Sequence, residues 1–64
     1  MADGEAEFEI AQRQVLQGRT RVARLREIVA ERRARRLPTQ ETEDVLARLQ
    51  ELQASHEAHL KQLA

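Results

Sequence analysis

The chain lacks several residue types, and each absence narrows what it can be. It has no cysteine, so disulfides and thiolate metal sites are excluded. It has no tryptophan or tyrosine and a single phenylalanine, so it has no aromatic platform on which single-stranded bases could stack. No apolar run approaches the roughly 18 residues that span a bilayer, and no apolar signal segment follows the acidic start. We therefore expect a soluble, cytoplasmic protein that does not associate with membranes.

The length of 64 residues allows one small domain, which we assign to residues 1–64. Chains this short bury little apolar surface and usually depend on a metal, a disulfide or a partner for stability. The absence of cysteine removes the disulfide and the thiolate metal site. Self-association is the simplest remaining source of burial.

Proline is also scarce, and the single Pro38 separates two stretches with helical periodicity. Their apolar stripes advance by alternating steps of three and four residues: Phe8, Ala11, Val15, Gly18, Val22, Leu25 and Val29, then Thr42, Val45, Leu49, Leu52, His56, His59 and Leu63. A proline inside one continuous helix would cost about 3 kcal/mol, and the stripe loses its phase there. The pattern predicts an all-α antiparallel hairpin with helices at about 4–36 and 39–63, a turn at Leu37-Pro38, and caps at Asp3 and Thr39.

The charges are balanced overall but strongly segregated. Four acids occupy residues 3–9, nine arginines and two glutamates occupy residues 13–36, and five acids and two bases follow Thr39. Folding at Pro38 is expected to bring the arginines of 32–36 beside the acids of 41–44, and the N-terminal acids toward His56, His59 and Lys61. Each exposed pair contributes about 0–1 kcal/mol, but together they favour the antiparallel orientation. In this register Gly18 lies near His56, and Phe8 projects beyond the second helix.

The apolar face is broader than a two-stranded coiled coil needs, because Ile28, Leu46 and Leu60 widen it. That breadth predicts a homodimer in which two hairpins form a four-helix bundle. The expected interaction seam consists of Phe8, Val15, Val22, Leu25, Val29, Val45, Leu49, Leu52, Leu60 and Leu63. The predicted function is a non-enzymatic protein–protein interaction module. The sequence leaves open the biological role, the bundle topology, a higher oligomer and any further protein partner.

An arginine row on the first helix supports an alternative function. Arg19, Arg26 and Arg33 follow one another at heptad spacing, and guanidinium groups bind phosphates well. This alternative is an RNA- or DNA-binding regulator. The run from Arg32 to Arg36 has the same phosphate-binding interpretation, but it also suits a helix C-terminus, where bases neutralise the helix dipole. The zero net charge favours the structural interpretation.

His56 and His59 are three residues apart, a spacing at which both could bind a metal on one helix face. Such a site needs a third ligand, which would have to come from a partner chain because Glu57 points to a different side of the helix. At a subunit interface the two histidines would instead weaken association near pH 6, and the sequence leaves metal binding and pH sensing open. Ser55 and His56 are neighbours in sequence and face apart on a helix, so no catalytic constellation is expected. We predict no enzyme activity and no cofactor.

A further pattern joins Ile10, Gln14, Val22 and Leu25 to Thr39-x-x-Thr42-x-x-Val45-Leu46 and His56-x-x-His59. It resembles a loose group of small, uncharacterised proteobacterial proteins that pair two helices around a short turn. The resemblance implies the hairpin fold but no activity. The size and layout are also similar to Rop-type RNA-binding dimers, a likeness of fold only.

Overall fold

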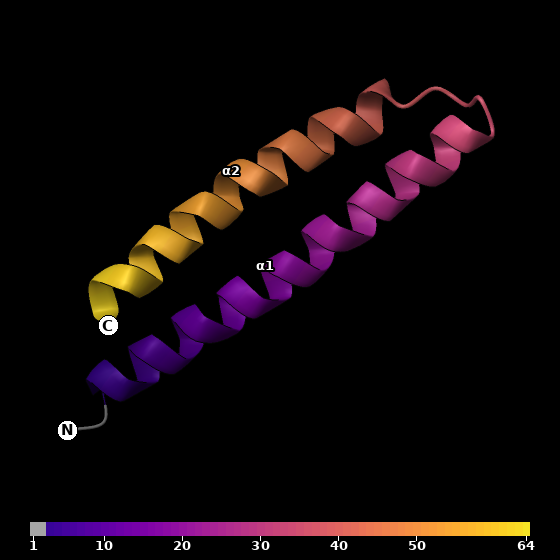
Figure 1. Cartoon of the computed structure of the whole chain (residues 1–64). Coiled ribbons are helices and arrows are strands. Elements are labelled where there is room, and N and C mark those ends of the chain that lie inside the picture. Colours follow the sequence, from indigo (N-terminus) through magenta and orange to yellow (C-terminus); the bar gives the residue numbers. More distant parts are fainter. Residues whose placement is uncertain (1–2) are drawn as a thin grey trace.

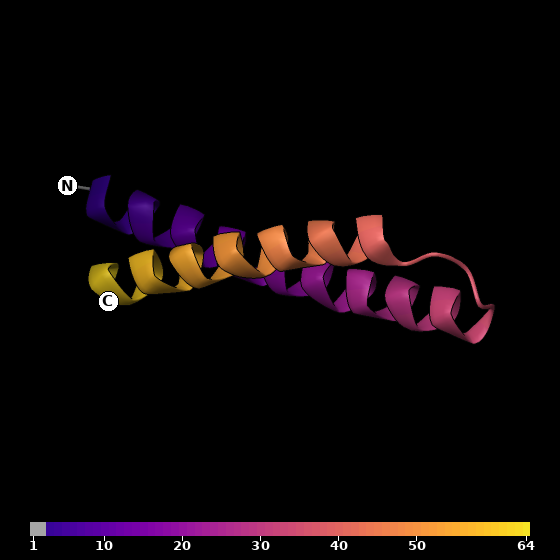
Figure 2. The same ribbon diagram turned by 90° about the horizontal axis from the view of Figure 1, so that it is seen from above.

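The computed structural model describes residues 3–64 and the side chains from residue 6 onward. Two helices, α1 (Asp3–Ala34) and α2 (Gln40–Leu63), lie side by side and antiparallel, so that the start of α1 lies beside the end of α2 (Figure 1). They cross at a shallow angle, which Figure 2 shows from above. The rod measures 54 × 14 × 13 Å. The predicted all-α hairpin is confirmed, whereas the predicted cap at Asp3 falls outside the described side chains.

The first helix ends at Ala34, two residues before the predicted end. Leu37 cannot be helical because it precedes a proline. The chain reverses through two backbone hydrogen bonds, from Leu37 N–H to the Arg32 carbonyl (2.8 Å) and from Arg36 N–H to the Arg33 carbonyl (3.0 Å). These are the bonds of a Schellman motif, and Arg36 occupies its left-handed position with φ of 58°.

The second helix begins where the sequence predicts, but Thr39 caps it differently from the expected way. The Thr39 carbonyl accepts the Glu43 N–H at 2.8 Å. Its hydroxyl donates to the Glu43 carboxylate at 3.0 Å, and makes no capping bond to the helix backbone. Its backbone is already near the helical region, with φ −119° and ψ −5°. The predicted position is right, whereas the predicted side-chain bond is wrong.

On α1 the seam between the helices follows the predicted stripe. Its buried side chains are Ala11, Val15, Val22 and Val29, of which Val22 is the most accessible at 8%. Phe8, Leu25 and the polar Arg32, which continue the same three-and-four spacing, are half-buried. The periodicity therefore predicted both the face that α1 buries and its phase.

On α2 the seam keeps four positions of the predicted stripe, Thr42, Leu49, His56 and Leu63, and shifts by one residue at the other three, from Val45, Leu52 and His59 to Leu46, Gln53 and Leu60. The half-buried positions are Thr42, Glu43, Leu46, Leu49, Gln53, His56, Leu60 and Leu63. Val45 and Leu52, which the stripe assigns to the seam, are 48% and 52% exposed, and His59 is also exposed. Along its whole length, α2 has no fully buried residue.

The residues that lie beside Gly18 and Phe8 also differ from those that the sequence predicts. Gly18 lies against the Gln53 side chain rather than against His56. Phe8 does not project past α2, because it lines a shallow depression with Leu60 and Ala64. Since α1 continues beside the last turn of α2, the phenylalanine ring is half-buried within the hairpin.

Candidate protein-interaction surface

One flank of the hairpin carries a row of ion pairs. Seven-residue steps forward along α1 match seven-residue steps backward along α2, which places Arg19 beside Glu57, Arg26 beside Gln50 and Arg33 beside Glu43. Nε and Nη2 of Arg19 both lie 3.1 Å from Glu57 Oε1, and Arg33 Nη2 bonds to Glu43. We call these six residues the ion-pair flank.

The ion-pair flank contains the three arginines that the sequence proposed for nucleic-acid contact. They do lie in one row on one side of the rod, and their side chains are exposed. Arg19 and Arg33, however, each have a carboxylate partner on α2. A phosphate would have to compete with these carboxylates, which weakens the electrostatic attraction between the three arginines and a nucleic-acid backbone.

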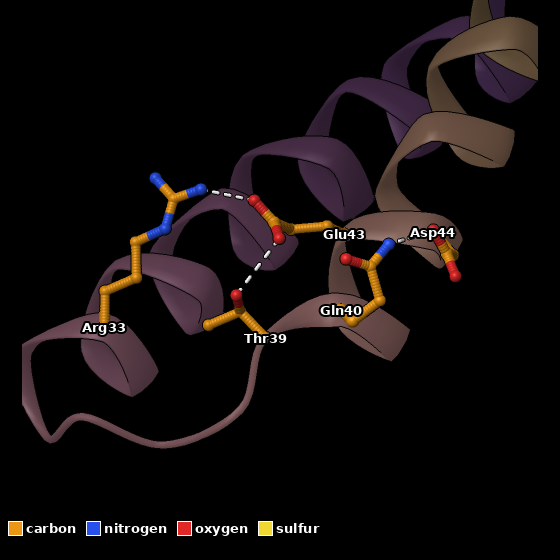
Figure 3. A network of polar contacts seen from close by, with 5 residues as sticks. All are labelled: Arg33, Thr39, Gln40, Glu43 and Asp44. Carbon is orange, nitrogen blue, oxygen red and sulfur yellow. Dashed lines mark hydrogen bonds and ion pairs between the residues drawn. The ribbon is translucent and has the colours of Figure 1, made fainter.

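A small polar network ties the ion-pair flank to the turn (Figure 3). Glu43 accepts bonds from both Arg33 and the Thr39 hydroxyl, while Gln40 Nε2 donates to Asp44 Oδ1 at 2.9 Å. Nearby, Arg32 Nε donates to the Pro38 carbonyl at 2.9 Å. The network fixes the start of α2 against the end of α1.

The predicted meeting of charge blocks is thus only partly realised. Within residues 6–64, Arg33 is the only member of the 32–36 cluster with an ion pair to the acids of 41–44. At the other end, the described ion pair is between Glu57 and Arg19, and Glu7 and Glu9 take no part in one. The blocks favour the antiparallel orientation, but within residues 6–64 ion pairs between the two helices form only where a heptad step aligns them, and the third pair, Arg24–Glu27, lies within α1.

The opposite flank is less polar and has no such row. It carries Gln14, Arg21 and Ile28 on α1 and Val45, Leu52 and His59 on α2, each set at heptad spacing. We call these six residues the open flank. Val45 and Leu52 are exposed there, and Ile28 is half-buried.

A groove of about 330 Å³ runs along the open flank at the middle of the rod. Its lining residues are Gln14, Gln17, Gly18, Arg21, Leu49, Leu52, Gln53 and His56. Gly18 contributes no side chain, which leaves room for the Gln53 amide to lie over the α1 backbone. The Gln53 Nε2 donates to the Val15 carbonyl at 2.8 Å. A Cβ built on Gly18 would stand 1.6 Å from Gln53 Oε1, so the glycine and the glutamine fit each other specifically.

Gln53 is a residue that the sequence interpretation missed. The heptad spacing of Leu46, Gln53 and Leu60 marks it as a seam position, but its polarity makes the competing row of Val45, Leu52 and His59 look equally apolar. Gln53 is half-buried and satisfied by a backbone carbonyl. A polar seam residue of this kind sets alignment at some cost in apolar burial.

The two histidines have different surroundings, because one lies in the seam and the other does not. His56 is half-buried in the seam, with Nδ1 3.2 Å from Gln14 Oε1, a hydrogen bond in the tautomer that protonates Nδ1. His59 is exposed on the open flank. Between residues 6 and 64 no group of three or more histidines and acids could hold a metal ion.

Neither described helix combines the length and apolar character that crossing a membrane requires. Comparison with known proteins adds nothing to these observations, since no family model, curated protein or solved structure matches the chain. The resemblance to small proteobacterial hairpin proteins therefore stays a prediction.

Proposed function

We propose that the protein is a non-enzymatic interaction module that works as a homodimer, with two hairpins forming a four-helix bundle. The observation that carries this proposal is the amount of surface that one hairpin leaves exposed. Its accessible area is 5319 Å². A compact monomer of 7.4 kDa would expose about 4,200 Å². The excess of roughly 1,000 Å² is close to the ~800 Å² that one partner buries in a stable interface.

The shape of the hairpin supports the same proposal. Its radius of gyration is 15.1 Å, whereas a compact domain of 64 residues would have about 11 Å and one of 128 residues about 14 Å. A single hairpin is thus as extended as a compact domain of twice its length. Two hairpins packed side by side would give a bundle of ordinary proportions.

The small core points in the same direction. Among residues 6–64 the buried apolar side chains are three valines and one alanine, all on α1. A two-layer helical structure usually needs a buried stripe on each helix. A second hairpin would supply the missing cover for α2.

The test is the mass in solution. We expect sedimentation equilibrium to give twice 7.4 kDa at concentrations above the dimer dissociation constant, with a monomer appearing on dilution. A fixed monomer mass up to millimolar concentration would contradict the proposal.

An RNA- or DNA-binding regulator is the second candidate, and the row of Arg19, Arg26 and Arg33 on one flank favours it. A salt titration with a generic duplex RNA separates the two functions. We expect no binding at low salt, because carboxylates already neutralise two of the three arginines. Micromolar binding that weakens steeply as salt rises would favour the regulator instead.

A further inference from the structure

The second helix has an apolar surface wider than the hairpin uses. Leu46 and Leu60 are half-buried in the seam, while Val45 and Leu52 belong to a row about 100° around the helix. In a four-helix bundle each helix contacts two neighbours, so its apolar arc must cover two directions. One direction is filled by α1, and the second points to the open flank.

The ion-pair flank is poorly suited to being covered. Its two ion pairs are exposed, with 63% and 64% of the Arg19 and Arg33 side chains accessible. Covering them would remove water from four charged groups, a penalty that the pairing often fails to offset. A partner is therefore expected to leave this flank in water.

The open flank can pack on a copy of itself. Among its six residues Arg21 is the only arginine, and there is no lysine, aspartate or glutamate, so two copies bring together few like charges. A two-fold interface uses the same patch on both chains, which requires this kind of self-match. The groove beside Gly18 also offers about 330 Å³ to side chains from the other copy.

We infer that a second copy of this chain docks on the open flank, over Ile28, Val45 and Leu52, and leaves the ion-pair flank at the outer surface of the dimer. This inference rests on the proposed function and specifies the face it uses. Such an interface would bury about 800 Å² on each chain, close to the roughly 1,000 Å² by which one hairpin exceeds the surface of a compact monomer.

Two leucines of equal exposure provide the experiment. Leu52 lies on the open flank and is 52% exposed; Leu16, three residues before Arg19 on the other side of α1, is 55% exposed. We expect Leu52→Glu to weaken dimerisation at least ~100-fold, because a charge would enter the interface, and Leu16→Glu to leave the dimer constant within about threefold. Sedimentation at several concentrations measures both.

A loss of dimer could also follow from unfolding, so a gain of association completes the test. Arg21→Leu removes the one charge of the open flank and should tighten the dimer by about tenfold through added apolar burial. Arg26→Leu makes the same change on the ion-pair flank and should not tighten it.

The outcomes separate the inference from the proposed function. If Leu16→Glu or Arg26→Leu has the larger effect, or if both members of a pair act equally, the dimer stands but the inferred face is wrong. If the unaltered chain is a monomer at all concentrations, the proposed function itself fails.

Discussion

Arg36 holds the left-handed position that ends α1, at φ of 58°. For a residue with a Cβ this conformation costs about 1–2 kcal/mol, which is why glycine is usual there. The two Schellman bonds on either side of it hold the reversal in place. The turn therefore contains a local strain that a single substitution can relieve.

Arg36→Gly is expected to stabilise the protein by about 1 kcal/mol. Arg35→Gly serves as the control, because it removes the same charge one residue earlier, where the described backbone has no positive φ. It should stabilise nothing. Urea unfolding followed by circular dichroism compares the two, and equal effects would refute strain at Arg36.

Gly18 and Gln53 should behave as a coupled pair. Gly18→Ala adds helix propensity worth about 1 kcal/mol but pushes the Gln53 amide away from the Val15 carbonyl. In a Gln53→Ala background that bond is already absent. We therefore expect Gly18→Ala to be more favourable by about 1 kcal/mol in the Gln53→Ala background than in the unaltered chain. Additive effects in the four-variant cycle would show that the two sites do not interact.

At the scale of the helix, the phase of α2 is the feature that its sequence left undecided. Val45 and Leu46, and again Leu52 and Gln53, are adjacent pairs, so steps of three and four residues fit either row. The choice depends on which side of α2 meets α1. The aligned pairs Arg19–Glu57 and Arg33–Glu43 mark the side chosen in the structure. On α1 the predicted stripe from Phe8 to Val29 contains no charged or amide side chain, and there the periodicity was sufficient.

The ion pairs between the helices should contribute little to stability, and exchanging the acid and the base of a pair should leave that contribution nearly unchanged. Glu57→Arg alone places two bases together and is expected to cost about 0.5–1 kcal/mol, and Arg19→Glu added to it should restore most of that loss. Thermal unfolding at low salt measures the effect, which should shrink in 1 M salt because screening is then nearly complete. A cost that persists in 1 M salt would mean that packing, and not charge, is responsible.

At the scale of the whole molecule, the hairpin, its turn and its antiparallel orientation were all predictable from Pro38 and the charge blocks. The ends of the helices and the candidate surface were less accessible. The end of α1 depends on backbone bonds that leave no mark in composition, and the exposure of Val45 and Leu52 depends on helix phase. The sequence showed that the apolar face was too wide, but not which part of it stayed open.

Unfolding should depend on the concentration of the chain, because a dimer gains stability by mass action. We expect the melting temperature to rise over a hundredfold increase in concentration. Leu49→Asp, which places a charge in the seam of α2, should lower helicity and mass together. A melting temperature independent of concentration would indicate a monomer that is stable alone.

The fit of Gln53 over Gly18 also specifies the axial register of the two helices, that is, which turn of α2 lies beside which turn of α1. Regular heptads tolerate a slip of seven residues, since such a slip keeps apolar rows in contact. Here a slip would move Gln53 from Gly18 to Ala11 or Leu25, which both carry a Cβ where Gly18 has none. Misaligned hairpins would bury an amide without its carbonyl partner, so one glycine and one glutamine exclude alternatives that the apolar stripes alone would permit.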